Sequence, residues 1–107
     1  MAIKVPHLEV TAVDSRRHER RPCRLAAKLQ INEGEIRCQV VNLSLGGVSV
    51  QVDPTIVLRP GLHVVVSCRE LGPHGARVSW GSHPRYGLAF DHVGTSPLVQ
   101  AYFDSLQ

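Results

Sequence analysis

The sequence predicts an all-β domain with a terminal helix: a six-stranded antiparallel β-barrel, capped by a C-terminal α-helix and preceded by a flexible N-terminal arm. A chain of 107 residues forms one domain around one core. From residue 23 onward, short runs that alternate apolar and polar residues are separated by turn signals. Closing six such strands into a barrel removes the exposed strand edges, which favours a barrel over an open sheet.

We expect strands over residues 23–31, 36–41, 48–52, 62–68, 76–80 and 86–90. The first two are joined by Asn32-Glu33-Gly34, which predicts a tight hairpin with Gly34 in the left-handed conformation. The run 62–68 is nearly continuous in apolar residues, so we expect both of its faces to be buried. Trp80 is expected to pack in or near the core.

The two ends of the chain are predicted to differ. Ser96 is an expected N-cap and Pro97 an expected first helical residue. The helix that follows is expected to be amphipathic, with Leu98, Tyr102, Phe103 and Leu106 at helical spacing. At the other end, residues 1–13 are expected to form the arm. Residues 14–107 are expected to form the barrel domain, including an arginine loop over 14–22, because Pro22 disfavours helix at the residue before it.

Composition and motifs exclude several classes of protein. The apolar runs are too short to span a bilayer, and the N-terminus does not resemble a signal peptide, so we expect a cytoplasmic protein. The three cysteines are widely spaced, and the six histidines lack metal-ligand spacing, which predicts neither a disulfide framework nor a metal site. A nucleophile elbow, a phosphate-binding glycine loop and a catalytic carboxylate pair are all missing, so we do not expect an enzyme.

The most informative segment is an arginine cluster at residues 14–24. Its five arginines stand against Asp14 and Glu19, so the segment carries the net charge of +3 of the whole chain. Arginine grips phosphate with two hydrogen bonds, donates to guanine O6 and N7, and stacks on bases. The cluster therefore indicates an anionic nucleotide ligand. The alternative is a solvated basic loop, paired weakly with Asp14 and Glu19.

A second motif, Asn42-Leu-Ser-Leu-Gly-Gly47, lies between two expected strands. Asn42 and Ser44 are two residues apart, so in an extended backbone they point to the same face and can read the polar edge of a base. Gly46 and Gly47 permit a positive φ and the close approach of a ligand. The alternative is an ordinary turn, because Asn, Ser and Gly are common turn residues.

The two motifs together resemble the PilZ domain family. The pattern is Arg-x-x-x-Arg, followed after about twenty residues by Asn-x-Ser-x-x-Gly. The first motif precedes the six short strands, and the second lies among them. We prefer Arg16 and Arg20 as the arginine pair, because Pro22 then lies two residues past the second arginine. Val78-Ser-Trp80 and Tyr86-Gly-Leu-Ala-Phe90 also resemble the last two strands of the family, so the resemblance covers roughly residues 14–106.

The resemblance implies a PilZ-like barrel that binds cyclic di-GMP, a bacterial second messenger. Arg16 and Arg20 would clamp the ligand, Asn42 and Ser44 would contact a guanine, and Gly47 would keep the turn open.

The arginine doublets leave the register open. Arg17 and Arg21 form the alternative pair. The residue before the pair, Ser15 or Arg16, influences in this family whether one ligand or a stacked pair binds. His18 lies between the arginines, where it would contact the ligand without a specific binding role.

The leading hypothesis is therefore a non-catalytic receptor for cyclic di-GMP, which serves as a ligand and not as a cofactor. Binding would order the N-terminal segment and signal to a downstream protein in trans, without membrane insertion. The alternative is a degenerate family member that acts as a protein adaptor and does not bind nucleotide. A barrel for single-stranded nucleic acid is a third possibility, but such proteins need aromatic stacking platforms, and aromatic residues make up only 5% of this chain.

Overall fold

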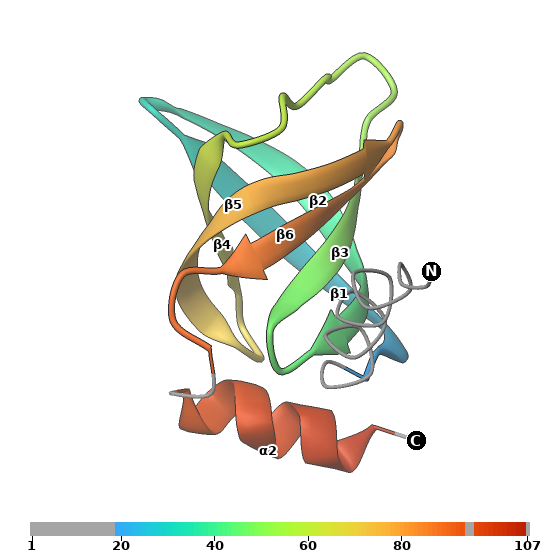
Figure 1. Cartoon of the computed structure of the whole chain (residues 1–107), viewed down its shortest axis with the longest axis vertical. Coiled ribbons are helices and arrows are strands. Elements are labelled where there is room, and N and C mark those ends of the chain that lie inside the picture. The colour runs from blue at the N-terminus through green and yellow to red at the C-terminus, as the bar shows by residue number, and fades with distance from the viewer. Residues whose placement is uncertain (1–18, 94–95, 107) are drawn as a thin grey trace, which may run out of the picture.

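Six antiparallel strands close into a barrel, and one helix covers an end of it (Figure 1). This computed structural model describes residues 19–93 and 96–106. The predicted fold class is confirmed, whereas the predicted arm at residues 1–13 lies outside the described residues. The elements are β1 Arg21–Ile31, β2 Gly34–Ser44, β3 Gly47–Val52, β4 His63–Cys68, β5 Gly72–Ser82, β6 Arg85–Phe90 and α2 Pro97–Ser105.

The strand order around the barrel is β1-β2-β3-β6-β5-β4. Pairing of β3 with β6 joins the two halves of the chain, from Gly47 opposite Ala89 to Gln51 opposite Arg85. The ring closes where β1 meets β4, through a short ladder from Lys28 to Gln30. In a ring of six strands, the β3–β6 and β4–β1 junctions lie on opposite sides of the barrel.

The core is formed by the residues of each strand that point inward. In β1, for example, Leu25, Ala27 and Leu29 are buried, whereas the residues between them are exposed. This alternation is the one expected of a sheet with a single apolar face. From α2, Val99 and Phe103 pack onto the same core.

The first hairpin departs from the prediction in two respects. β1 already begins at Arg21, so the end of the expected arginine loop is strand. The left-handed residue of the turn is Asn32, with φ of 55°, and not Gly34, which is the first residue of β2. Asparagine tolerates this conformation because its short polar side chain can bond locally.

Two burial predictions were wrong. In β4, Val64 and Val66 are buried but His63 is exposed, because a barrel of one layer gives each strand only one face toward the core. Trp80 is 37% exposed. A bulge between Val78 and Trp80 shifts the register of β5, so that the indole lies on the outer face while Val78 points inward.

The helix begins as predicted. The Ser96 hydroxyl accepts a hydrogen bond from the Val99 amide at 3.3 Å, and Pro97 is the first helical residue. Leu98, however, is 54% exposed, because the face of α2 that meets the barrel is defined by Val99 and Phe103, one turn apart. No helix among the described residues is long and apolar enough to cross a membrane.

Candidate functional site

Arg20 connects the arginine cluster to the barrel surface. Its Nη1 donates to Asn42 Oδ1 and to Ser49 Oγ, both at 3.2 Å. Asn42 and Ser49 are register partners in the β2–β3 ladder. The structure therefore brings together two predicted site residues, Arg20 and Asn42, that are 22 positions apart in the chain.

A bulge in β2 sets the direction in which Asn42 points. The β2–β3 register shifts between Val40 and Asn42. Val40 and Leu43 are both fully buried, so the bulge reverses the alternation of the strand between them. Asn42 is thereby turned to the outer face, where its amide meets Arg20.

Asn42 belongs to a row of register partners that crosses four neighbouring strands. Asn42 of β2 lies opposite Ser49 of β3, Ser49 opposite Gly87 of β6, and Gly87 opposite Trp80 of β5. We call these four residues the outer row. Neighbouring strands are about 4.8 Å apart, so the row spans roughly 14 Å.

Gly87 lets an aromatic side chain lie flat within this row. A Cβ at position 87 would overlap the ring atoms of Trp80, so the indole rests directly on the β6 backbone. With Arg20 bonded to Asn42 and Ser49, this face of the sheet presents a guanidinium, an amide and a partly exposed indole.

Ser44 and Gly47 shape the turn that follows Asn42. Ser44 is 2% exposed, and its hydroxyl accepts from the Gly46 amide at 3.1 Å and donates to the Gly47 carbonyl at 3.3 Å. A Cβ at Gly47 would overlap the Leu88 carbonyl oxygen. Neither Gly46 nor Gly47 has a positive φ, so glycine is needed at 47 for the close approach of β6 and not for the turn conformation.

Arg21 points to a different part of the molecule from Arg20. Its Nη1 donates to the carbonyl oxygens of Phe103 at 2.8 Å and Leu106 at 3.1 Å, at the C-terminal end of α2. The guanidinium also lies 4.1 Å from the centre of the Phe103 ring and pairs with Glu19 at 3.4 Å. A cation at this end of a helix is stabilised by the unpaired carbonyls and the helix dipole.

Ser15, Arg16, Arg17 and His18 lie outside the described residues, so their assignments remain predictions. Sequence reasoning missed Ser49. A signal for it existed, because pairing outward from the turn at Leu45-Gly46 places Ser49 opposite Asn42. The bulges that turn Asn42 and Trp80 outward leave no comparable signal in the sequence.

Titratable groups do not form a metal site in the part of the chain that the structure describes. No three His, Cys, Asp or Glu side chains there gather as metal ligands would. A His–carboxylate contact joins His63 Nε2 to Asp91 Oδ2 at 2.7 Å. This hydrogen bond lowers the pKa of Asp91 below its ordinary value.

A protein family and several solved structures are similar to this chain. The PilZ domain family model matches residues 14–103. No curated protein matches the sequence significantly.

Among solved structures, the PilZ domain of YcgR from Escherichia coli with c-di-GMP is similar, with 18% identity and a TM-score of 0.68 over 84% of this chain and 89% of that one. The Bacillus subtilis inhibitor of motility (MotI/DgrA) is similar at 19% identity and a TM-score of 0.62, over 83% of this chain and 50% of that one. The PilZ domain of CeSA from a cellulose-synthesising bacterium has 16% identity and a TM-score of 0.59, covering 69% and 81% of the two chains.

Proposed function

The chain belongs to the PilZ domain family, and on that premise we propose that it is a non-catalytic receptor for cyclic di-GMP. The family consists of c-di-GMP receptors and adaptors. A similar structure, that of the YcgR PilZ domain, contains c-di-GMP. That likeness supports the choice of ligand, while the choice of residues rests on the geometry of this chain.

The observation that carries the proposal is the double hydrogen bond from Arg20 to Asn42 and Ser49. It anchors the arginine segment on the outer face next to the only amide of the outer row. A guanidinium has five donor hydrogens, so one nitrogen bonded to the barrel leaves others for a phosphate or for guanine O6 and N7. Asn42 supplies both a donor and an acceptor to the base edge.

The same geometry favours Arg16 as the partner of Arg20. The alternative pair, Arg17 and Arg21, requires a guanidinium that is already held by two carbonyls of α2 and by the Phe103 ring. Releasing Arg21 would cost about 1.5–3 kcal/mol, the usual contribution of hydrogen bonds to a charged group. Arg20 loses less, because its present partners also lie within the proposed ligand site.

Trp80 extends the proposed site with a stacking surface. Its indole lies in the outer row and is 37% exposed. A purine that stacks on this ring buries apolar area, while its edge faces Asn42, and aromatic stacking contributes about 1–3 kcal/mol per base. Because Gly87 has no side chain, the indole can lie directly on the β6 backbone.

The signal passes, in this proposal, through the arginine segment. A ligand with two phosphates holds Arg16 and Arg20 together against the outer row, and the surface so formed is recognised by a partner protein in trans. Ordering a segment costs about 1–2 kcal/mol per residue, which charge-assisted contacts to the two phosphates must exceed.

Titration calorimetry of the purified chain with cyclic di-GMP tests the proposal. We expect binding at micromolar concentration, and markedly weaker binding of cyclic di-AMP, which lacks the guanine O6 acceptor. Arg16→Ala is expected to weaken binding, and Arg17→Ala to leave it nearly unchanged. A folded chain that ignores cyclic di-GMP but retains a protein partner would instead identify an adaptor.

A further inference from the structure

The barrel is incompletely closed on the side opposite the outer row. β1 begins at Arg21, yet it pairs with β4 only from Lys28 to Gln30. Past that ladder the β4–β5 hairpin closes on itself, with Cys68 opposite Gly72. Within residues 19–93 and 96–106, the 21–27 part of β1 therefore has a strand neighbour in β2 alone.

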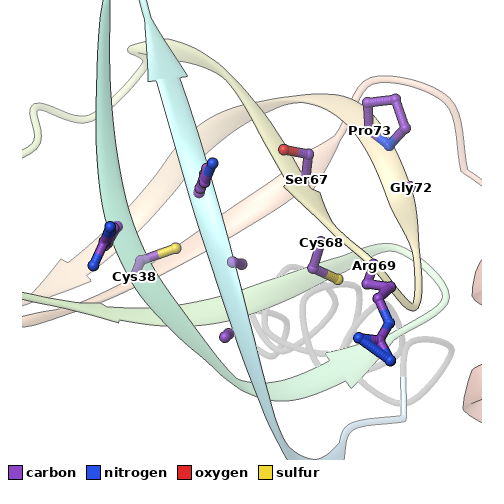
Figure 2. A pocket seen from close by; sticks show the side chains of 10 residues that line it. Cys38, Ser67, Cys68, Arg69, Gly72 and Pro73 are labelled. Atoms are coloured by element: carbon purple, nitrogen blue, oxygen red, sulfur yellow. The ribbon is translucent and has the colours of Figure 1, made fainter.

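An opening of about 780 Å³ lies between β1 and the β4–β5 hairpin, and we call it the seam opening (Figure 2). Figure 2 shows Cys38 entering from β2, and Cys68 from the end of β4 with Arg69 beside it. The walls are made of small side chains, which leave the space unfilled: Ala26, Ala27, Cys38, Cys68, Gly72 and Pro73. The volume is within the range of about 300–1,000 Å³ that is usual for small-molecule sites.

The thiols in the wall are uncharged at neutral pH. Burial raises the pKa of Cys38 to about 12 and also raises the pKa of Cys68 above its ordinary value. A neutral thiol behaves as a small hydrophobic group. The interior of the seam opening is therefore suited to an apolar ligand body.

The rim of the seam opening is cationic, with Lys28, Arg37 and Arg69 around it. Lys28 and Arg37 lie directly opposite each other in the β1–β2 ladder, an arrangement of like charges that destabilises a sheet. Lys28 reaches Glu35 at 3.9 Å, but both side chains are more than half exposed, so this pair is weak. In the described part of the chain, neither Arg37 nor Arg69 forms a salt bridge.

From the apolar interior and the cationic rim together, we propose that the seam opening binds an amphipathic anion. The ligand has an unbranched apolar body inside the opening and a carboxylate or phosphate head between Lys28, Arg37 and Arg69. An anion there relieves the repulsion between Lys28 and Arg37. A second copy of the chain is a poor occupant, because two such rims would repel each other.

This site is independent of the proposed nucleotide site. The β4–β1 junction and the β3–β6 junction lie on opposite sides of the ring of strands. The seam opening shares no residue with the outer row or with Arg20. The two ligands are therefore expected to bind without competition.

Titration calorimetry with sodium hexanoate, octanoate and decanoate, each below its micellar concentration, tests the proposal. We expect the Kd to fall about fourfold for each added methylene, as burial of the chain predicts. Decyl phosphate should bind like decanoate, whereas decanol and decyltrimethylammonium should bind at least tenfold more weakly. In amide NMR spectra, the ligand should shift Ala26, Cys68 and Gly72.

Charge reversal at the rim gives the matched comparison. Arg37→Glu and Arg69→Glu are both at the surface of the opening, and each should weaken decanoate binding tenfold or more. Arg59→Glu makes the same charge change on the exposed loop between β3 and β4, and should leave the Kd unchanged. Bound cyclic di-GMP should also leave it unchanged, so the two proposals can fail separately.

Three results would overturn the proposal. The first is equal binding of decanoate and decyltrimethylammonium, which marks unspecific surfactant adsorption. The second is equal weakening by Arg59→Glu and Arg69→Glu. The third is co-sedimentation of the chain with phosphatidylglycerol vesicles while the free anions leave the amides of Ala26, Cys68 and Gly72 unmoved, which marks a lipid surface as the ligand and not a single anion.

Discussion

The two opposite sides of the barrel close the sheet in different ways. On the β3–β6 side, five residue pairs join the strands, and glycines at 47 and 87 let a carbonyl and an indole lie directly against the backbone. On the β4–β1 side, only three pairs form, and small side chains leave a large opening. The first side holds polar groups at defined positions, which suits reading a base. The second side leaves a space that can accommodate the apolar part of a ligand.

Gly47→Ala is expected to have the largest effect, because it breaks the tightly closed side. The added Cβ overlaps the Leu88 carbonyl, a backbone atom that cannot move without opening the β3–β6 ladder. We expect a loss of about 3 kcal/mol in the free energy of unfolding, measured by urea denaturation.

Gly34→Ala is the matched control, since its Cβ would meet only Ile31 O at an ordinary 3.6 Å. Equal losses in the two variants would contradict the account of Gly47.

Arg21→Ala separates the structural arginine from Arg20, the proposed ligand arginine. It removes two hydrogen bonds to α2 carbonyls and the contact with the Phe103 ring. We expect a loss of about 2 kcal/mol in unfolding free energy.

Arg24→Ala removes an equal charge from an exposed position of β1 and should cost little. If Arg21→Ala were as stable as Arg24→Ala, the helix contact would not hold α2 in solution.

Gly87→Ala tests the β3–β6 side of the barrel, where the nucleotide site is proposed. The methyl group displaces the Trp80 indole from the β6 backbone. We expect a cost of about 1 kcal/mol in stability and a shift in fluorescence emission, for which Trp80 is the single reporter in the chain. Binding of cyclic di-GMP should weaken as well. Unchanged emission would show that the indole does not rest on Gly87.

The seam side predicts an effect on stability that appears only at alkaline pH. Burial raises the pKa of Cys38 from 9.0 to about 12, so its contribution to stability is complete below pH 9 and is lost as pH rises from 9 toward 12. Cys38→Ala should flatten the fall in the free energy of unfolding over this range. Chemical denaturation at several pH values measures this fall. An equally steep fall in the variant would mean that Cys38 is not the titrating group.

The fold was predictable because alternation and turn residues are local signals. Apolar residues at every second position marked the inward face of β1, and Ser96-Pro97 marked the start of α2. The resemblance to a family then indicated cyclic di-GMP as the ligand to propose. Arg20 and Asn42, two residues singled out by the motifs, lie within hydrogen-bonding distance of each other, whereas their roles toward a ligand stay predictions.

The errors arose where tertiary structure overrides a local pattern. Trp80 faces outward because a bulge changes the register of β5, and bulges leave no clear sequence mark. Gly47 is required by a strand from the other half of the chain, which no local turn rule reveals. Which of Arg20 and Arg21 contacts the helix depends on where α2 packs. Two adjacent arginines cannot be told apart in this respect from the sequence.

The central claim is that Arg20 anchors cyclic di-GMP on the outer row, and titration calorimetry of Arg20→Ala tests it most directly. Arg24→Ala serves as the control of equal charge. Loss of charge-assisted hydrogen bonds worth about 1.5–3 kcal/mol predicts a Kd about 10- to 100-fold higher for Arg20→Ala, with a smaller loss of unfolding free energy than in Arg21→Ala, because the bond to Asn42 is exposed. A variant Arg20→Ala that is folded and binds cyclic di-GMP as tightly as the parent would contradict the claim.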